Sequence, residues 1–222
     1  MLSPSTIKFL KELKKNNNKA WFDINRKMYE EAKADFAAFI QKVIDQLSKK
    51  DLSIKNLTAK DCMFRINRDV RFSKDKSPYK TNMGAYLNRG GKKSLYAGYY
   101  FHCEPGRSFT GGGLWMPMPP ELKKVRQEID YNFAAFRKIT SSKKFKSVYT
   151  DLSRDQEYVL TRLPKGYEAD NPAAAYLKLK SFVAMTSIKD TDLIAKDLVK
   201  KTVASFEALQ PLIEFINHSL TE

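Results

Sequence analysis

The densest positive charge of the chain lies between Phe64 and Lys93, where nine basic residues and two acidic ones give +7 in thirty residues. Arginine forks bind phosphate or carboxylate oxygens in a bidentate manner, and lysine adds a mobile point charge. The alternative is a structural network in which Asp69 neutralises its arginine neighbours. The predicted ligand-binding residues of this stretch are Arg65, Asn67, Arg68, Asp69, Arg71, Lys76, Tyr79 and Lys80.

Three consecutive glycines, Gly111, Gly112 and Gly113, extend the predicted anion site. Consecutive backbone amides without side chains can form a nest for an anion. The alternative is that the glycines relieve crowding where aromatic side chains of a neighbouring strand cross. Neither a Walker loop nor a Rossmann fingerprint is present, so the triplet does not specify a nucleotide fold.

His102 is the candidate catalytic residue, because Tyr100 and Glu104 lie two residues away on the same face of a predicted strand. A histidine beside a carboxylate can act as a general acid or base. The alternative is a hydrogen-bonded structural histidine near a turn. The other histidine, His218, lies near the far end of the chain and there are only two cysteines, so the sequence indicates neither a metal site nor a cofactor.

The whole chain of 222 residues carries a net charge of +15, and 42% of its residues are hydrophobic. This composition supports a folded core and favours an anionic partner, either a phosphorylated small molecule or nucleic acid. A scatter of solubilising lysines would give the same charge. Cys62 and Cys103 lie in apolar runs and are expected to be reduced and buried. We expect no membrane insertion and a cytoplasmic location, because no signal peptide or membrane span is apparent. The oligomeric state stays open.

The elements that would position these residues fall into three parts. In residues 1–60 the spacing of apolar residues predicts two helices, one over Leu2–Lys15 and a long one from Lys19 towards Lys50. Residues 61–118 alternate with the period of strands, and the predicted strands are Asp61–Phe72, Met83–Leu87, Leu95–Glu104 and Ser108–Trp115.

Residues 119–222 are rich in helix. The predicted helices are Glu121–Ile139, Ser142–Asp151 and Thr191–Leu220, the last broken or bent at Pro211. An edge strand is predicted over Tyr158–Leu163 and a further strand over Ser181–Ser187. We therefore predict a single α+β domain over residues 1–222, with an antiparallel or mixed sheet packed against N- and C-terminal helices.

Several long runs resemble one family: FRINRDVRFSKDKSPYKTN, YYFHCEPGRSFTGGGLWMP, LPKGYEADNP and LKLKSF. The chain is similar over almost its whole length to the bacterial and fungal family catalogued as domain of unknown function 2461. The resemblance implies no established activity, cofactor or catalytic residue. The family's pattern matches this sequence at Arg65, Asn67, Arg68, Asp69, Arg71, Phe72, Lys76, Pro78, Tyr79, Lys80, His102, Pro105, Gly112, Gly113 and Trp115.

These observations leave three hypotheses open. The first, which we favour, is a binding module whose basic, aromatic-lined sheet face holds a phosphate-bearing or other anionic ligand, with nucleic acid as one form of it. The second is an enzyme that acts on a phosphorylated or carboxylated substrate with His102 as general acid or base. The third is a structural or interaction protein whose polar residues form an internal network. The sequence does not decide whether the protein is an enzyme.

Overall fold

A four-stranded antiparallel sheet forms the centre of the computed structural model, which describes residues 1–71 and 73–221. The strands are β1 (Met83–Asn88), β2 (Gly98–Cys103), β3 (Phe109–Leu114) and β4 (Phe182–Ser187), and they lie in the order β1-β2-β3-β4. The predicted α+β class and the predicted antiparallel sheet are confirmed.

Three N-terminal helices precede the sheet: α1 (Pro4–Lys15), α2 (Lys19–Ile24) and α3 (Arg26–Leu47). The prediction of one long helix from Lys19 was wrong, because Asn25 ends α2 and begins α3. The Asn25 side chain donates a hydrogen bond to the carbonyl of Trp21 at 2.9 Å, a local bond that competes with helix continuation. A 3-10 turn η1 (Leu52–Ile54) and the short helix α4 (Ala59–Cys62) then lead to the sheet.

The chain between β3 and β4, and the chain after β4, is largely helical. Its helices are α5 (Pro119–Tyr131), α6 (Phe133–Thr140), α7 (Lys143–Tyr149), η2 (Gln156–Tyr158), α8 (Ala174–Leu177), α9 (Asp190–Leu193) and α10 (Leu198–Thr221). The predicted helix Glu121–Ile139 is divided at Asn132, and the predicted edge strand Tyr158–Leu163 is instead η2 and an isolated bridge from Val159 to Leu179. The sequence predicted a break or a bend at Pro211; the helix α10 continues through this residue, which excludes the break.

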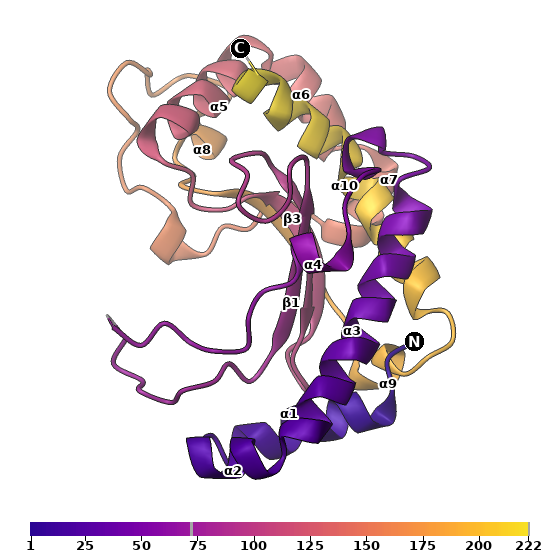
Figure 1. Cartoon of the computed structure of the whole chain (residues 1–222). Coiled ribbons are helices and arrows are strands. Elements are labelled where there is room, and N and C mark those ends of the chain that lie inside the picture. The colour runs from indigo at the N-terminus through magenta and orange to yellow at the C-terminus, as the bar shows by residue number, and fades with distance from the viewer. Residues whose placement is uncertain (72, 222) are drawn as a thin grey trace.

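Helices cover one face of the sheet and leave the other face to the connecting segments. Alternate residues of β2 point to the helices, and Tyr99, Phe101 and Cys103 are fully buried there. The ring of Phe101 packs on Phe39 of α3 at 4.7 Å. The ring of Tyr99 packs on Phe206 of α10 at 5.2 Å. Figure 1 shows α3 and α10 on this side of the sheet.

Residues 63–71 and 73–82 leave the sheet as two irregular segments that lie side by side, which we call the arm (Figure 1). The prediction of a strand over Asp61–Phe72 was wrong for the described residues, Phe72 lying outside them: α4 includes Cys62, and the only bridges of this segment join Met63 to Ala85 and Asn67 to Tyr79. The arm is anchored at Tyr79, whose ring stacks on Phe22 of α2 at 3.9 Å. Its backbone also exchanges two hydrogen bonds with the side chain of Asn17, at 2.8 and 3.1 Å.

The helices of the described chain include none with the length and apolarity that a membrane crossing needs.

Candidate functional site on the open sheet face

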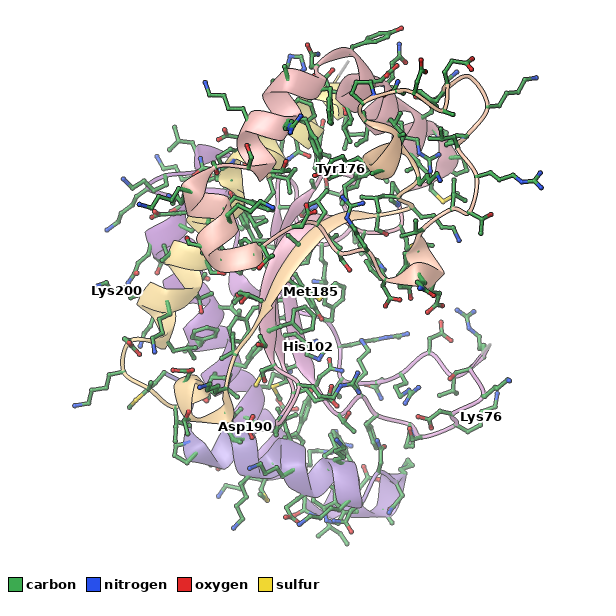
Figure 2. All side chains as sticks on the ribbon, turned by 180° about the vertical axis from the view of Figure 1, so that it is seen from behind. Lys76, His102, Tyr176, Met185, Asp190 and Lys200 are labelled. Carbon is green, nitrogen blue, oxygen red and sulfur yellow. The ribbon has the colours of Figure 1, made fainter. Side chains whose placement is uncertain are left out.

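The face of the sheet opposite α3 and α10, which we call the open face, carries Tyr100, His102, Phe109 and Met185. The strand register places these residues on one side, because Tyr100 pairs with Gly111, His102 with Phe109, and Gly111 with Met185. The arm and residues 153–180 flank this side of the sheet (Figure 1), and Figure 2 shows His102 and Met185 on it. The predicted shared face of Tyr100 and His102 is confirmed.

A chain of hydrogen bonds runs through His102. Its Nδ1 lies 3.1 Å from the hydroxyl of Tyr100, and its Nε2 lies 3.3 Å from Oε2 of Glu104. The hydroxyl of Thr81 donates to Oε1 of Glu104 at 2.9 Å. In a neutral imidazole, this carboxylate accepts the proton on Nε2, so Nδ1 accepts the proton of Tyr100. The ring is therefore held in one tautomer and orientation.

Glu104 is itself fixed by the tight turn that joins β2 to β3. Its N–H donates to the hydroxyl of Ser108 at 3.0 Å, and that hydroxyl donates to the carbonyl of Glu104 at 2.8 Å. Gly106 takes the left-handed φ of +82° that the second central position of a type II turn needs. The sequence Pro105-Gly106 thus positions the carboxylate that orients His102.

Aromatic rings surround the histidine. His102 stacks on Phe109 with ring centres 4.7 Å apart, and Tyr100 lies 5.6 Å from Phe109. Phe64, at the base of the arm, meets the edge of Tyr100 at 6.3 Å and is 42% exposed. Tyr100 lies directly over Gly84, where an added Cβ would come within 2.5 Å of its hydroxyl oxygen. The glycine therefore makes room for the aromatic cluster.

Burial changes the protonation of this cluster. Desolvation lowers the pKa of His102, and the charge of Arg107 lowers it further, while the hydrogen bond and charge of Glu104 oppose this. Burial, with a smaller contribution from Glu104, raises the pKa of Tyr100 to about 12. At neutral pH the site therefore holds a neutral imidazole and a protonated phenol.

The predicted anion-binding residues of the arm fall into two groups, and the first group is already engaged in contacts within the arm. Arg68 pairs with Asp75, and Arg71 forms a two-pronged pair with Asp69, at 2.9 and 2.7 Å. These contacts fit the structural network that the sequence left as the alternative for the arginines. The ammonium group of Lys76 donates to the carbonyl of Val70 at 2.9 Å, and Figure 2 shows Lys76 at the outer end of the arm, away from His102.

Lys80 and Arg65 lie at the base of the arm, beside the open face. The ammonium group of Lys80 donates to the carbonyl of Arg65 at 3.0 Å and lies 5.6 Å from the ring centre of Phe64. Burial, and then the charge of Arg65, lowers the pKa of Lys80. Within residues 1–71 and 73–221, neither side chain forms an ion pair with a carboxylate. Arg65 is close enough to Asp69 for its charge to lower the pKa of that carboxyl, whereas no carboxylate acts on the pKa of Lys80.

The remaining predicted residues do not point into this cluster. Tyr79 is buried against Phe22, and Asn67 is exposed on the outer part of the arm, paired with Tyr79 through the backbone. The glycine triplet lies in β3, a central strand whose backbone pairs with β2 and β4. A Cβ on Gly111 would lie 2.5 Å from the carbonyl of Ala184, so these glycines allow close strand approach. This geometry favours the packing role for the triplet over an anion nest.

Two contributors to the site, Phe64 and Thr81, escaped the sequence analysis, and the contact between Phe109 and His102 was not predicted. Strand parity alone could have placed Phe109 beside His102, given the turn at Pro105-Gly106. The contact of Thr81 with Glu104 depends on the path of the arm, which no local pattern encodes. Among the residues that the structure describes, no three His, Cys, Asp or Glu side chains gather closely enough to hold a metal ion.

Fold and site together define an α+β protein with one helix-covered sheet face and one open face lined by aromatic, histidine and lysine side chains. The chain belongs to the family described as conserved hypothetical protein, DUF2461, whose model matches residues 5–215. The predicted family is therefore confirmed. Comparison with curated proteins and with solved structures gives no match.

Proposed function

We propose that the protein is a binding module for a phosphate-bearing ligand that also carries a planar ring, and that the open face is its binding surface. The observation that carries this proposal is the position of Lys80. Its half-buried ammonium group has lost part of its hydration, and Arg65 adds a second positive charge. A bound phosphate would supply the counter-charge that Lys80 lacks among the described residues, since Asp69 acts on Arg65 but not on Lys80.

The neighbouring rings fit the second part of such a ligand. Phe64, Tyr100 and Phe109 form a continuous set of aromatic contacts directly beside Lys80. A nucleobase stacked on these rings would leave its phosphates within reach of Lys80 and Arg65. The paired residues Arg68 and Arg71 would then shape the arm and would contribute to binding only through the general positive field.

The test is a titration of a fluorescent nucleoside diphosphate against wild type, Lys80→Ala and Arg65→Ala. Each variant should bind about tenfold or more weakly, because a charge-assisted hydrogen bond typically contributes about 1.5–3 kcal/mol. The matched control is Lys200→Ala, an exposed lysine of α10 that lies away from the open face (Figure 2). Equal losses in all three variants, or no loss at Lys80, would exclude the open face as the site.

An enzyme is the second candidate, and the hydrogen-bond chain through His102 is the observation that favours it. Glu104 orients the imidazole as a carboxylate does in a general-base site, and Tyr100 would be the group that meets the substrate. This hypothesis predicts turnover of a bound phosphoester that His102→Gln abolishes while binding persists. Binding without turnover would exclude the enzyme hypothesis and leave the binding-module hypothesis as the only one of the two.

We place this function in the cytoplasm. The free, buried thiols of Cys62 and Cys103 suit a reducing compartment.

A further inference from the structure

A second aromatic site lies at the other end of the open face. Trp115 follows β3 with the same parity as Phe109, Gly111 and Gly113, and it is 53% exposed. Its ring meets Tyr158 edge to face, with ring centres 4.7 Å apart. Tyr158 belongs to residues 153–180, which flank the open face (Figure 1). The backbone beside Trp115 is held by a hydrogen bond of 2.9 Å from the N–H of Met116 to the hydroxyl of Ser181.

The distance between the two aromatic sites excludes a small ligand that contacts both. Phe109 and Trp115 are six residues apart along an extended strand, which corresponds to about 20 Å at roughly 3.3 Å per residue. The floor between them is formed by Gly111 and Gly113, which have no side chains, and by Tyr86, whose hydroxyl donates to the carbonyl of Gly113 at 2.9 Å. A ligand that uses both ends must extend over this distance, as a chain of repeated units does.

The charges differ between the two ends. Lys80 and Arg65 provide positive charge beside Phe64. At the far end, Asp155 and Glu157 lie near Tyr158 and raise the pKa of its hydroxyl, after burial as the main cause. The ammonium group of Lys180 donates to the carbonyl of Glu157 at 3.2 Å. The first end thus suits phosphates and a ring, whereas the second suits mainly a ring.

From this arrangement we propose that the open face binds a single strand of nucleic acid, which lies along β3 from the arm to Trp115. The inference rests on the proposed function and specifies its ligand. Exposed aromatic rings stack on bases that are free of a partner strand, which a duplex does not offer. One base would stack among Phe64, Tyr100 and Phe109, and a base a few nucleotides away would stack on Trp115.

The experiment measures fluorescence anisotropy of labelled oligonucleotides of about two, four and eight nucleotides, beside a labelled mononucleotide and a duplex. We expect affinity to rise steeply with length until both aromatic sites are occupied, and the duplex to bind more weakly than the strand. Affinity should fall linearly on a logarithmic salt scale, because phosphate contacts release counterions. Affinity that does not change with length would overturn the inference.

Two variants separate this inference from the proposed function. Lys80→Ala should weaken both the mononucleotide and the octanucleotide. Trp115→Ala should weaken only the octanucleotide, by about tenfold, which is the usual scale for one stacked base. Tyr131→Ala, which removes an exposed ring of α5, is the control. If Trp115→Ala binds the octanucleotide like wild type, the single-strand proposal fails and the binding module stands; if the mononucleotide does not bind either, both fail.

Trp115 also provides a direct readout of occupancy. The chain has two tryptophans, and Trp21→Phe leaves Trp115 as the only one. In this variant the octanucleotide should quench the tryptophan emission, whereas the mononucleotide should leave it unchanged. Quenching by the mononucleotide would place the first ligand at Trp115 and contradict the assignment of the two ends.

Discussion

The ring of His102 is largely covered, and both of its nitrogens have hydrogen-bond partners. Glu104 favours the charged imidazolium, but desolvation outweighs it and lowers the pKa of His102. Burial and Glu104 act on the pKa of His102 in opposite directions, so a ligand that adds negative charge nearby would raise this pKa. The protonation state of His102 is therefore sensitive to what occupies the open face.

The lowered pKa of His102 predicts a loss of stability in mild acid. Below about pH 6.5 the unfolded chain takes up a proton at this residue that the folded chain still refuses, so the free energy of unfolding falls as the pH falls. Above that value neither state is protonated and the contribution vanishes. Denaturant titrations at about pH 7 and about pH 5 should show a larger loss for wild type than for His102→Gln.

The difference between wild type and variant isolates the contribution of His102 from that of the rest of the chain. Its neighbours Glu104, Tyr100 and Arg107 remain present in both proteins. An equal loss in wild type and variant would show that the folded state accepts the proton as readily as the unfolded chain.

The arm is the element on which the proposed site depends, and it has few backbone hydrogen bonds to the sheet. Its position is set by Tyr79, which stacks on Phe22 and is bonded twice to Asn17. Asn17 lies between the C-cap of α1 and the N-cap of α2, so three consecutive asparagines perform three different tasks. The contacts of Tyr79 therefore also hold Lys80 and Phe64 in position, because both residues belong to the arm.

Asn17→Ala should loosen the arm without unfolding the sheet. It removes two hydrogen bonds, which typically contribute about 1 kcal/mol each, so amide exchange at residues 63–82 should become about tenfold faster or more. Exchange in β2 and β3 should be unchanged. Asn132→Ala, at the junction of α5 and α6, serves as the control. If the whole chain exchanges faster to the same extent, the arm is part of the global unfolding unit.

Elements with a regular hydrophobic period were predictable, and those that depend on tertiary contacts were not. The alternation of Tyr99, Phe101 and Cys103 with Tyr100 and His102 predicted both the strand and its two faces. The same alternation in the arm led to a wrong prediction, because Ile66 and Tyr79 are buried without belonging to a sheet strand, and Tyr79 packs on Phe22 of α2. Pro211 failed as a helix breaker because Leu209, Leu212 and Ile213 bury α10 on either side of it.

The candidate site was predictable in composition but not in grouping. Counting charges placed Arg65, Arg68, Arg71 and Lys80 in one cluster, whereas the fold pairs two of these arginines with Asp69 and Asp75. Which cations find a carboxylate partner depends on how the side chains of the arm are placed in the fold, and periodicity carries no information about that placement.

At the scale of the whole molecule, the hydrophobic core and the proposed binding surface lie on opposite faces of one sheet. The helix-covered face contributes to a single hydrophobic cluster that includes residues of α1, α3, α10 and all four strands. The open face has glycines at Gly84, Gly98, Gly111 and Gly113 in place of side chains. A surface of this kind buries little apolar area by itself, so its shape is maintained by the core behind it.

The two cysteines test whether that core behaves as one unit. Cys62 and Cys103 are fully buried, and burial raises the pKa of both thiols to about 12. At about pH 8 roughly one thiol in ten thousand is ionised, so a thiol reagent should not label the native protein.

Both residues belong to the same hydrophobic cluster, although Cys62 lies in α4 at the base of the arm and Cys103 lies in β2. If folding is cooperative throughout, labelling should require global unfolding, and mass spectrometry should find both cysteines modified at the same rate at every denaturant concentration. Faster labelling of Cys62 would mean that α4 and the arm unfold before the sheet. The arm would then move independently of the sheet beside the proposed binding surface.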